Sequence, residues 1–182
     1  TADLGDGAPR VTLAGAWHLE PAFVEAVAGR IGEVLETFPP EDRSSVPVLL
    51  TAHSLPKRVA ESEPGYLDQL RQTAEAIAAV AGLAPGRWRF CWQSAGHEPG
   101  EWMKPDFADL MPELRAAGHR TVLVAPVQFL ADHLEVLYDV DVGAREQAAA
   151  AGLEFRRIAS LNVAPRFIEG LAAVARATLA QA

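Results

Sequence analysis

Residues 120–127 read RTVLVAPV, with Val122, Leu123 and Val124 in consecutive positions. A strand with apolar side chains on both faces is typical of a parallel sheet that helices cover on both sides. Four further short apolar runs are predicted as strands, at residues 10–17, 46–52, 87–93 and 154–161. Between the runs lie segments such as 66–80, where apolar residues recur at steps of three and four, as in a helix. This alternation predicts an α/β fold, a three-layer doubly wound parallel sheet of the Rossmann-like type.

The ends of the helices carry two further signals. Gly82, Gly118 and Gly152 closely follow helix-like segments, where a left-handed residue commonly ends a helix. Residues 17–28 and 161–172 share the frame Pro-x-Phe-x-Glu-x-x-Ala, with proline in the expected first turn of a helix. Two interpretations stay open for this echo, namely two similar helix starts or a duplicated unit.

Composition excludes several classes of function. The chain has 182 residues, 49% of them apolar, and its net charge of −8 comes from 16 Lys and Arg against 24 Asp and Glu. An acidic protein is a poor candidate for binding nucleic acid, so no nucleic-acid partner is expected. No apolar run approaches the roughly 20 residues of a transmembrane helix, and only peripheral contact with a membrane is left open. The single cysteine, Cys91, excludes an internal disulfide and a Cys-x-x-Cys pair.

Candidate site residues follow two of the predicted strands. His53 follows the run 46–52, and Asp132, Glu135 and Asp139 follow the run 120–127. On a helix that begins near Asp132, these three carboxylates share one stripe, which suits a divalent metal or a proton path. The alternative interpretations are a solvated acidic start of a helix and a packed histidine. If the histidine and the stripe face one crevice at the carboxyl ends of the strands, they could bind a metal or move a proton near neutral pH.

A third crevice segment contains the turn Ser94-Ala95-Gly96. Such a turn could hold an anion with backbone N–H groups, but it lacks both the glycine-rich dinucleotide pattern and the lysine of a phosphate-binding loop. Nucleotide binding is therefore disfavoured. Trp102, on a nearby loop with proline and glycine, is the aromatic candidate for contact with a flat ligand.

Several of these segments together resemble one known family. They are Thr51-Ala52-His53-Ser54-Leu55-Pro56, Trp92-Gln93-Ser94-Ala95-Gly96 with Trp102, and the run Asp132-His133-Leu134-Glu135-Val136-Leu137-Tyr138-Asp139. In order and spacing, through nearly the whole chain, they resemble the ferrochelatases. The resemblance implies a lyase that inserts ferrous iron into a porphyrin, coproporphyrin III or protoporphyrin IX, in heme biosynthesis.

The resemblance also implies roles for residues. His53 and Glu135 would be the catalytic pair, and His53, Glu135 and Asp139 the residues that contact metal. The resemblance leaves open which of His53 and Glu135 is the base and which is the metal ligand. The residues Ser54, Tyr66, Ser94 and Trp102 would form the substrate-binding wall. Ferrous iron is then a substrate, with no tightly bound cofactor. No iron–sulfur cluster is expected, because a cluster needs several cysteines.

Family members have two similar lobes, and these motifs occupy the C-terminal one. We therefore expect residues 1–182 to form about one chelatase-like lobe, with the helix at 165–180 packing on an absent N-terminal lobe, and the isolated chain to be inactive. A bacterial-type, cytoplasmic enzyme is expected. Two alternatives stay open. One is a chelatase for another tetrapyrrole such as sirohydrochlorin, and the other is a non-catalytic module that binds a tetrapyrrole or metal.

Overall fold

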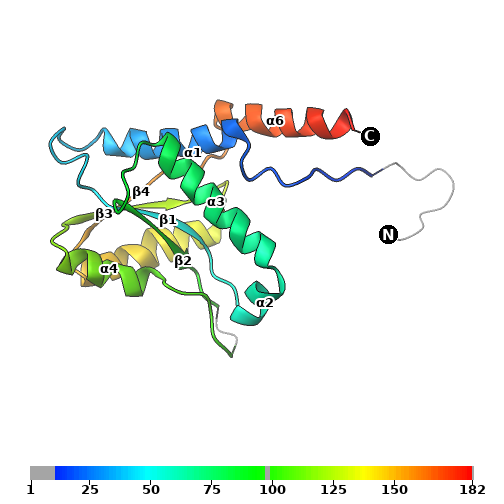
Figure 1. Cartoon of the computed structure of the whole chain (residues 1–182). Coiled ribbons are helices and arrows are strands. Elements are labelled where there is room, and N and C mark those ends of the chain that lie inside the picture. Colours follow the sequence, from blue (N-terminus) through cyan, green and yellow to red (C-terminus); the bar gives the residue numbers. More distant parts are fainter. Residues whose placement is uncertain (1–10, 97–98, 182) are drawn as a thin grey trace.

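The four strands form one parallel sheet at the centre of three layers (Figure 1). The computed structural model describes residues 11–96 and 99–181. Their order in the sheet is β2-β1-β3-β4, and every neighbouring pair is parallel. Their bounds are β1 Val48–His53, β2 Trp88–Gln93, β3 Thr121–Pro126 and β4 Glu154–Arg157. The predicted α/β fold with a doubly wound parallel sheet is therefore confirmed.

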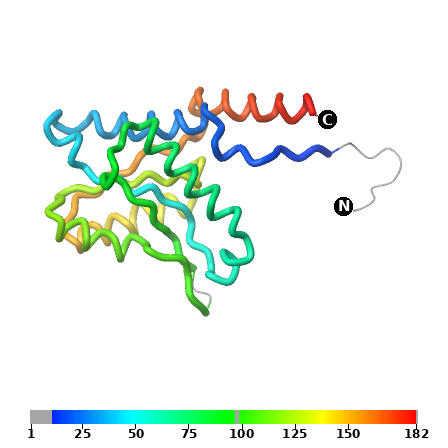
Figure 2. The backbone as a smooth tube through the Cα atoms, viewed as in Figure 1, coloured from blue at the N-terminus to red at the C-terminus, as the bar shows by residue number. Residues whose placement is uncertain are grey.

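Helices cover both faces of this sheet (Figure 2). One face carries α1 (Pro21–Leu35) and α3 (Pro64–Val80), which the short α2 (Lys57–Ser62) precedes. The other face carries α4 (Phe107–Ala116), the π-helix η1 (Val136–Ala144) and α5 (Arg145–Ala150), which continues from η1. The last helix, α6 (Pro165–Leu179), packs beside α1 and projects away from the sheet (Figure 1).

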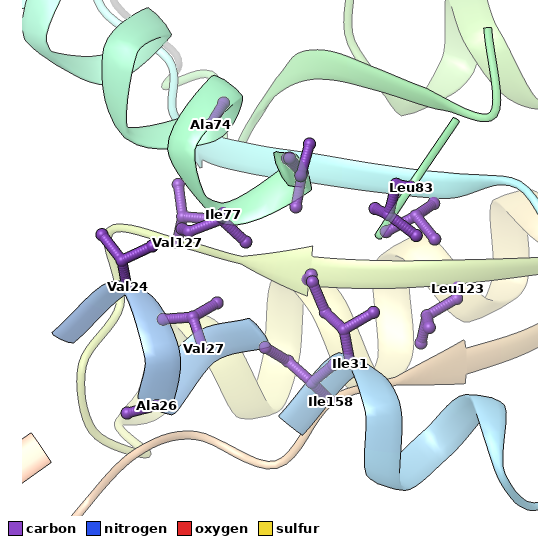
Figure 3. Packing of buried hydrophobic residues seen from close by; sticks show 14 of the residues in the cluster. Val24, Ala26, Val27, Ile31, Ala74, Ile77, Leu83, Leu123, Val127 and Ile158 are labelled. Atoms are coloured by element: carbon purple, nitrogen blue, oxygen red, sulfur yellow. The ribbon is translucent and has the colours of Figure 1, made fainter. Parts of the chain in front are cut away.

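The core lies on both faces of the sheet, as the apolar run in β3 predicts. Leu123 faces α1 and α3, where Val27, Ile31 and Ile77 pack around it in one cluster (Figure 3). Its neighbours Val122 and Val124 belong to the second cluster, with α4, η1 and α5. The side chains of Val122, Leu123 and Val124 are all fully buried. Their burial removes apolar surface from water on both sides of the sheet, which is the main force that holds the layers together.

The first predicted strand is wrong. Residues 11–17 pair with no strand among the described residues, and Val11 and Leu13 are 75% and 85% exposed. Residue 10 lies outside the described residues. Strand propensity depends on a partner strand and a buried face, and neither is available here. The predicted strand at 154–161 is also shorter than expected, since β4 ends at Arg157.

The predicted helix ends are confirmed. Gly82, Gly118 and Gly152 all have positive φ, at 64°, 94° and 76°. The two similar helix starts pack against each other, with the rings of Phe23 and Phe167 6.2 Å apart. Gly170 allows this approach, because a Cβ there would lie 3.3 Å from the side chain of Ala22. Whether the echo reflects a duplicated unit stays a prediction.

Candidate functional site

The topology places a crevice between the carboxyl ends of β1 and β3. These two strands are neighbours, but the chain leaves β1 toward β2 on one side and leaves β3 toward β4 on the other. In open α/β sheets, ligands bind at such a switch point, outside the carboxyl ends of the strands. His53 is the last residue of β1, and Glu135 lies on the connection from β3 to β4. The two predicted catalytic residues thus meet at this point.

The position of His53 is set by contacts to both its ring and its backbone. Its Nδ1 lies 2.6 Å from the carbonyl oxygen of Ser54, which can only accept, so Nδ1 carries the proton. In the neutral ring, Nε2 then has a free lone pair, suited to bind a metal or take a proton. The backbone N–H of His53 donates to Oε1 of Gln128 at 2.9 Å, and Phe129 packs in an edge contact 6.2 Å from the imidazole.

Glu135 faces this lone pair. Its Oε1 lies 3.8 Å from His53 Nε2, too far for a hydrogen bond. The separation is less than the roughly 4.2 Å spanned by two metal–ligand bonds of about 2.1 Å each. The side chains of His53 and Glu135 are 30% and 50% exposed, so both are open to solvent. One imidazole nitrogen and one carboxylate oxygen can therefore share a small cation.

The helix that carries Glu135 differs from the prediction. Regular helix begins at residue 134, after Asp132, and residues Val136–Ala144 form a π-helix. Such helices are rare and frequently occur at functional sites. Glu135 and Asp139 still line one cavity. The predicted stripe of three carboxylates is wrong in its first member, because Asp132 points elsewhere.

Asp132 is instead a structural anchor. Its carboxylate accepts hydrogen bonds from Asn162 Nδ2 at 2.9 Å and Ser160 Oγ at 2.8 Å. These bonds, with a smaller contribution from the charge of Arg157, hold the pKa of Asp132 below its usual value. Asp132 therefore stays charged and bound within the fold, away from the Glu135 cavity.

His53 and Glu135 together line a cavity of about 550 Å³. This volume is in the usual range for small-molecule sites. Its polar side is His53 and Glu135, and its apolar side includes Leu134 and Tyr138, which are 80% and 64% exposed. The full lining is His53, Ser94, Ala95, Gly96, Leu134, Glu135, Tyr138 and Asp139. Within residues 11–96 and 99–181, no three His, Cys, Asp or Glu side chains converge to hold a metal.

Of the four predicted wall residues, only Ser94 lines this cavity. Its φ of 56° is left-handed, and its buried Oγ has no hydrogen-bond partner among the described residues. Ser54, by contrast with the prediction, does not belong to this wall. Its side chain is buried, and its Oγ donates a hydrogen bond to the carbonyl oxygen of Met103 at 3.2 Å. The turn after β1 packs against the 103 loop and so turns Ser54 inward. Trp102 lies behind the wall, with its ring against Gly96.

Tyr66 lines a different cavity. This second hollow, of about 420 Å³, lies beside α1 and α3 and includes Trp17, His18 and Leu70. The hydroxyl oxygen of Tyr66 accepts a hydrogen bond from Nε2 of Gln128, whose Oε1 accepts from His53 N–H. Burial raises the pKa of Tyr66. Tyr66 is therefore linked to His53 through Gln128, and its role in binding substrate stays a prediction.

Sequence reasoning missed three residues at this site. Gln128 and Phe129 lie two and three residues after the end of β3, where sites in parallel sheets are expected, but sequence reasoning assigned neither a role. Tyr138 stands in the distinctive run 132–139 but carries no charge, so it drew no attention. Gln128 and Phe129 contact His53, and Tyr138 lines the cavity that His53 and Glu135 share.

Comparison with known proteins assigns this arrangement to a family. The family model for ferrochelatase matches residues 2–179. The chain belongs to the ferrochelatase family. It is 40% identical over 164 residues to a ferrochelatase of Herpetosiphon aurantiacus, covering 90% of the chain and 53% of that protein. The resemblance seen in the sequence is therefore confirmed.

In two further relatives, the match again covers most of this chain and about half of the relative. A ferrochelatase of Deinococcus radiodurans is 38% identical over 158 residues, which are 87% of the chain and 50% of that protein. A coproporphyrin III ferrochelatase of Bacillus subtilis is 36% identical over 169 residues, 92% of the chain and 54% of that protein. The chain thus spans about half the length of the curated relatives it matches. In the part of the chain that the structure describes, no helix is long and apolar enough to cross a membrane.

Proposed function

We propose that this chain carries the metal-inserting half of a ferrochelatase, a lyase that places ferrous iron in a porphyrin during heme biosynthesis. The observation that carries the proposal is the 3.8 Å distance between Nε2 of His53 and Oε1 of Glu135, two residues that line the same cavity. Membership of the ferrochelatase family supports the same activity. Ferrous iron is a substrate here, and the proposal includes no resident cofactor.

The reaction needs two proton acceptors and a path for the cation. Two pyrrole N–H protons must leave as iron enters, and a neutral imidazole near pH 7 can take a proton or bind the metal. Glu135 can carry the metal or pass a proton to solvent, since its side chain is half exposed. Asp139 lines the same cavity and would extend the path outward. Which of His53 and Glu135 is the base stays open within the proposal.

The apolar side of the cavity suits a flat, largely apolar substrate. Leu134 and Tyr138 are exposed beside Glu135, and Ser94 offers a buried hydroxyl with no partner in the described chain. We propose coproporphyrin III or protoporphyrin IX as the acceptor. Relatives named as coproporphyrin III ferrochelatases match at 34–36% identity, which supports testing coproporphyrin first.

The proposal extends to a second lobe and a cellular place. Apolar side chains on α6 stay exposed, with Ile168 at 44%, Leu171 at 37% and Leu179 at 74%, and we propose that α6 contacts the other lobe of the enzyme. The isolated chain would then be inactive with porphyrin. Cys91 is a buried free thiol, which suits a reducing compartment, and we propose the cytoplasm, with peripheral contact with a membrane left open.

The test is an absorbance assay of the complete protein with ferrous iron and each of the two porphyrins. His53→Ala and Glu135→Gln are expected to abolish iron insertion while far-UV circular dichroism stays unchanged. Matched controls are His119→Ala and Glu146→Gln, which lie outside the cavity and should keep full activity. Retained insertion in both site variants would refute the assigned roles. A wild-type protein that binds porphyrin but never metallates it would favour a non-catalytic carrier.

A further inference from the structure

We infer that Arg157 is a positioning residue that holds Glu135 opposite His53, an inference that rests on the proposed function of that pair. Arg157 is the last residue of β4 and lies outside the cavity. It contacts neither member of the pair. Its role follows from what its guanidinium binds on each side of Glu135.

The first contact is with the π-helix. Nε of Arg157 lies 2.6 Å from Oδ1 of Asp141, and Nη2 lies 2.9 Å from Oδ2. This is a two-bond pair between a planar guanidinium and a carboxylate, the strongest common form of ion pair in proteins. The side chain of Arg157 is only 14% exposed and that of Asp141 27%, so solvent screens the pair less than it would on the surface. Asp141 lies six residues after Glu135.

The second contact is with the segment before Glu135. Nη1 of Arg157 donates to the carbonyl of Ile158 at 2.9 Å and lies 3.6 Å from Oδ1 of Asp132. Asn162 secures the same carboxylate and also accepts the backbone N–H of Asp132 at 2.9 Å. Asp132 lies three residues before Glu135. The loop after β4 therefore holds the Glu135 segment on both sides.

Arg157 with Asp132 and Asp141, called the clamp below, is connected to His53 through the sheet. Arg157 pairs with Val124 in the register of β4 and β3, and β3 in turn pairs with β1, which ends at His53. Backbone pairing through β3 thus links the strand that carries Arg157 to the strand that ends at His53. Glu135 itself is half exposed, and within residues 11–96 and 99–181 its side chain forms no hydrogen bond. Its position relative to His53 therefore depends on how its helix is held.

The chemistry of arginine makes the clamp testable. A lysine at position 157 keeps the charge but cannot offer two parallel donors to one carboxylate. The neighbouring Arg156 is a matched control, because it is half exposed and pairs with Glu154 on its own strand. Arg156→Lys makes the same chemical change one residue away, outside the clamp.

The experiment measures Zn²⁺ affinity and iron-insertion kinetics on the complete protein. Zn²⁺ binding at this site is defined as the binding that the wild type shows and His53→Ala lacks. Arg157→Lys is expected to weaken that binding and to lower kcat/KM for ferrous iron by about 10–100-fold, the usual effect of losing support behind a metal ligand. The KM for porphyrin should stay within about twofold, and Arg156→Lys should match the wild type. Asp141→Asn tests the same pair from the other side if Arg157→Lys folds poorly.

The outcomes separate this inference from the proposed function. Equal zinc affinity and equal iron kinetics in Arg157→Lys and Arg156→Lys would overturn the positioning role. A loss confined to thermal stability, with unchanged constants for the folded protein, would also overturn it. If Arg157→Lys weakens zinc binding but the wild type metallates no porphyrin, the positioning role stands and the proposed function fails.

Discussion

Gly96 offers a sharp test of how the cavity wall is built. It lines the cavity with His53, and a Cβ at this position would lie 2.8 Å from Cη2 and 2.9 Å from Cζ2 of Trp102. Ordinary contacts to a Cβ begin at 3.4 Å, so in Gly96→Ala the indole or the wall must move by about 0.6 Å to restore an ordinary contact. The backbone of Gly96 does not require glycine, because its φ is not left-handed. The effect of the substitution is therefore the clash alone.

The expected cost falls on catalysis more than on stability. A misplacement of about 1 Å near reacting groups can reduce a rate by about 100-fold, so a shift of 0.6 Å should lower kcat/KM by roughly tenfold, about 1.4 kcal/mol. The exposed loop can relax, so the free energy of unfolding should fall by less than about 1 kcal/mol. Iron-insertion kinetics and urea denaturation measure the two quantities.

A double-mutant cycle isolates the contact between Gly96 and Trp102. Trp102→Phe removes the two ring atoms that the new Cβ would meet. In that background, Gly96→Ala should therefore change kcat/KM by less than twofold. An equal effect of Gly96→Ala in both backgrounds would refute the reasoning, as would a wild-type rate in Gly96→Ala alone.

Three other predictions concern stability and reactivity. Leu110 is fully buried beside β2, so Leu110→Ala should cost about 2–5 kcal/mol of unfolding free energy in urea. Val80→Ala, at a 55% exposed position, should stay within about 0.5 kcal/mol. The hydrogen bonds that lower the pKa of Asp132 stabilise the fold above the ordinary aspartate pKa of about 3.9, and this contribution is lost as pH falls through the lower folded value. Asp132→Asn should thus be less stable than the wild type at pH 7 and the gap should narrow toward pH 3; a constant gap would contradict this. Burial raises the pKa of the Cys91 thiol, so a thiol reagent should label it only after denaturation, and rapid labelling of the native protein would show that β2 opens.

The sheet was predictable where burial alone decides the structure. The run in β3 is apolar on both faces, and each side chain there finds a helix-covered core. The run at 10–17 has a similar local composition, but no strand among the described residues lies beside it. A single sequence does not show which strand is left without a neighbour. The same limit explains the early end of β4 at Arg157, whose side chain turns to Asp141.

The site was predictable as a pair of residues and not as a wall. His53 and Glu135 follow strands whose ends the topology brings together, so strand order alone predicts their meeting. Ser54 turns inward against the 103 loop, far along the chain, and the π-helix is bound through Asp141 by Arg157, which comes 16 residues later. The protonated nitrogen of His53 is set by its bond to the Ser54 carbonyl, a contact that only coordinates reveal.

Both outer strands of the sheet have features that discourage further pairing. The edge of β2 is covered by the 105–106 segment, because Trp92 N–H donates to the carbonyl of Pro105 at 2.8 Å and Trp92 bridges to Asp106. Beside it, Lys104 pairs with Asp106 and Asp109. The other edge, β4, is only four residues long and carries Glu154 and two arginines. Short, charged or covered edges prevent sheets from adding strands from other molecules. The sheet of this chain is therefore protected from edge-to-edge aggregation by its own residues.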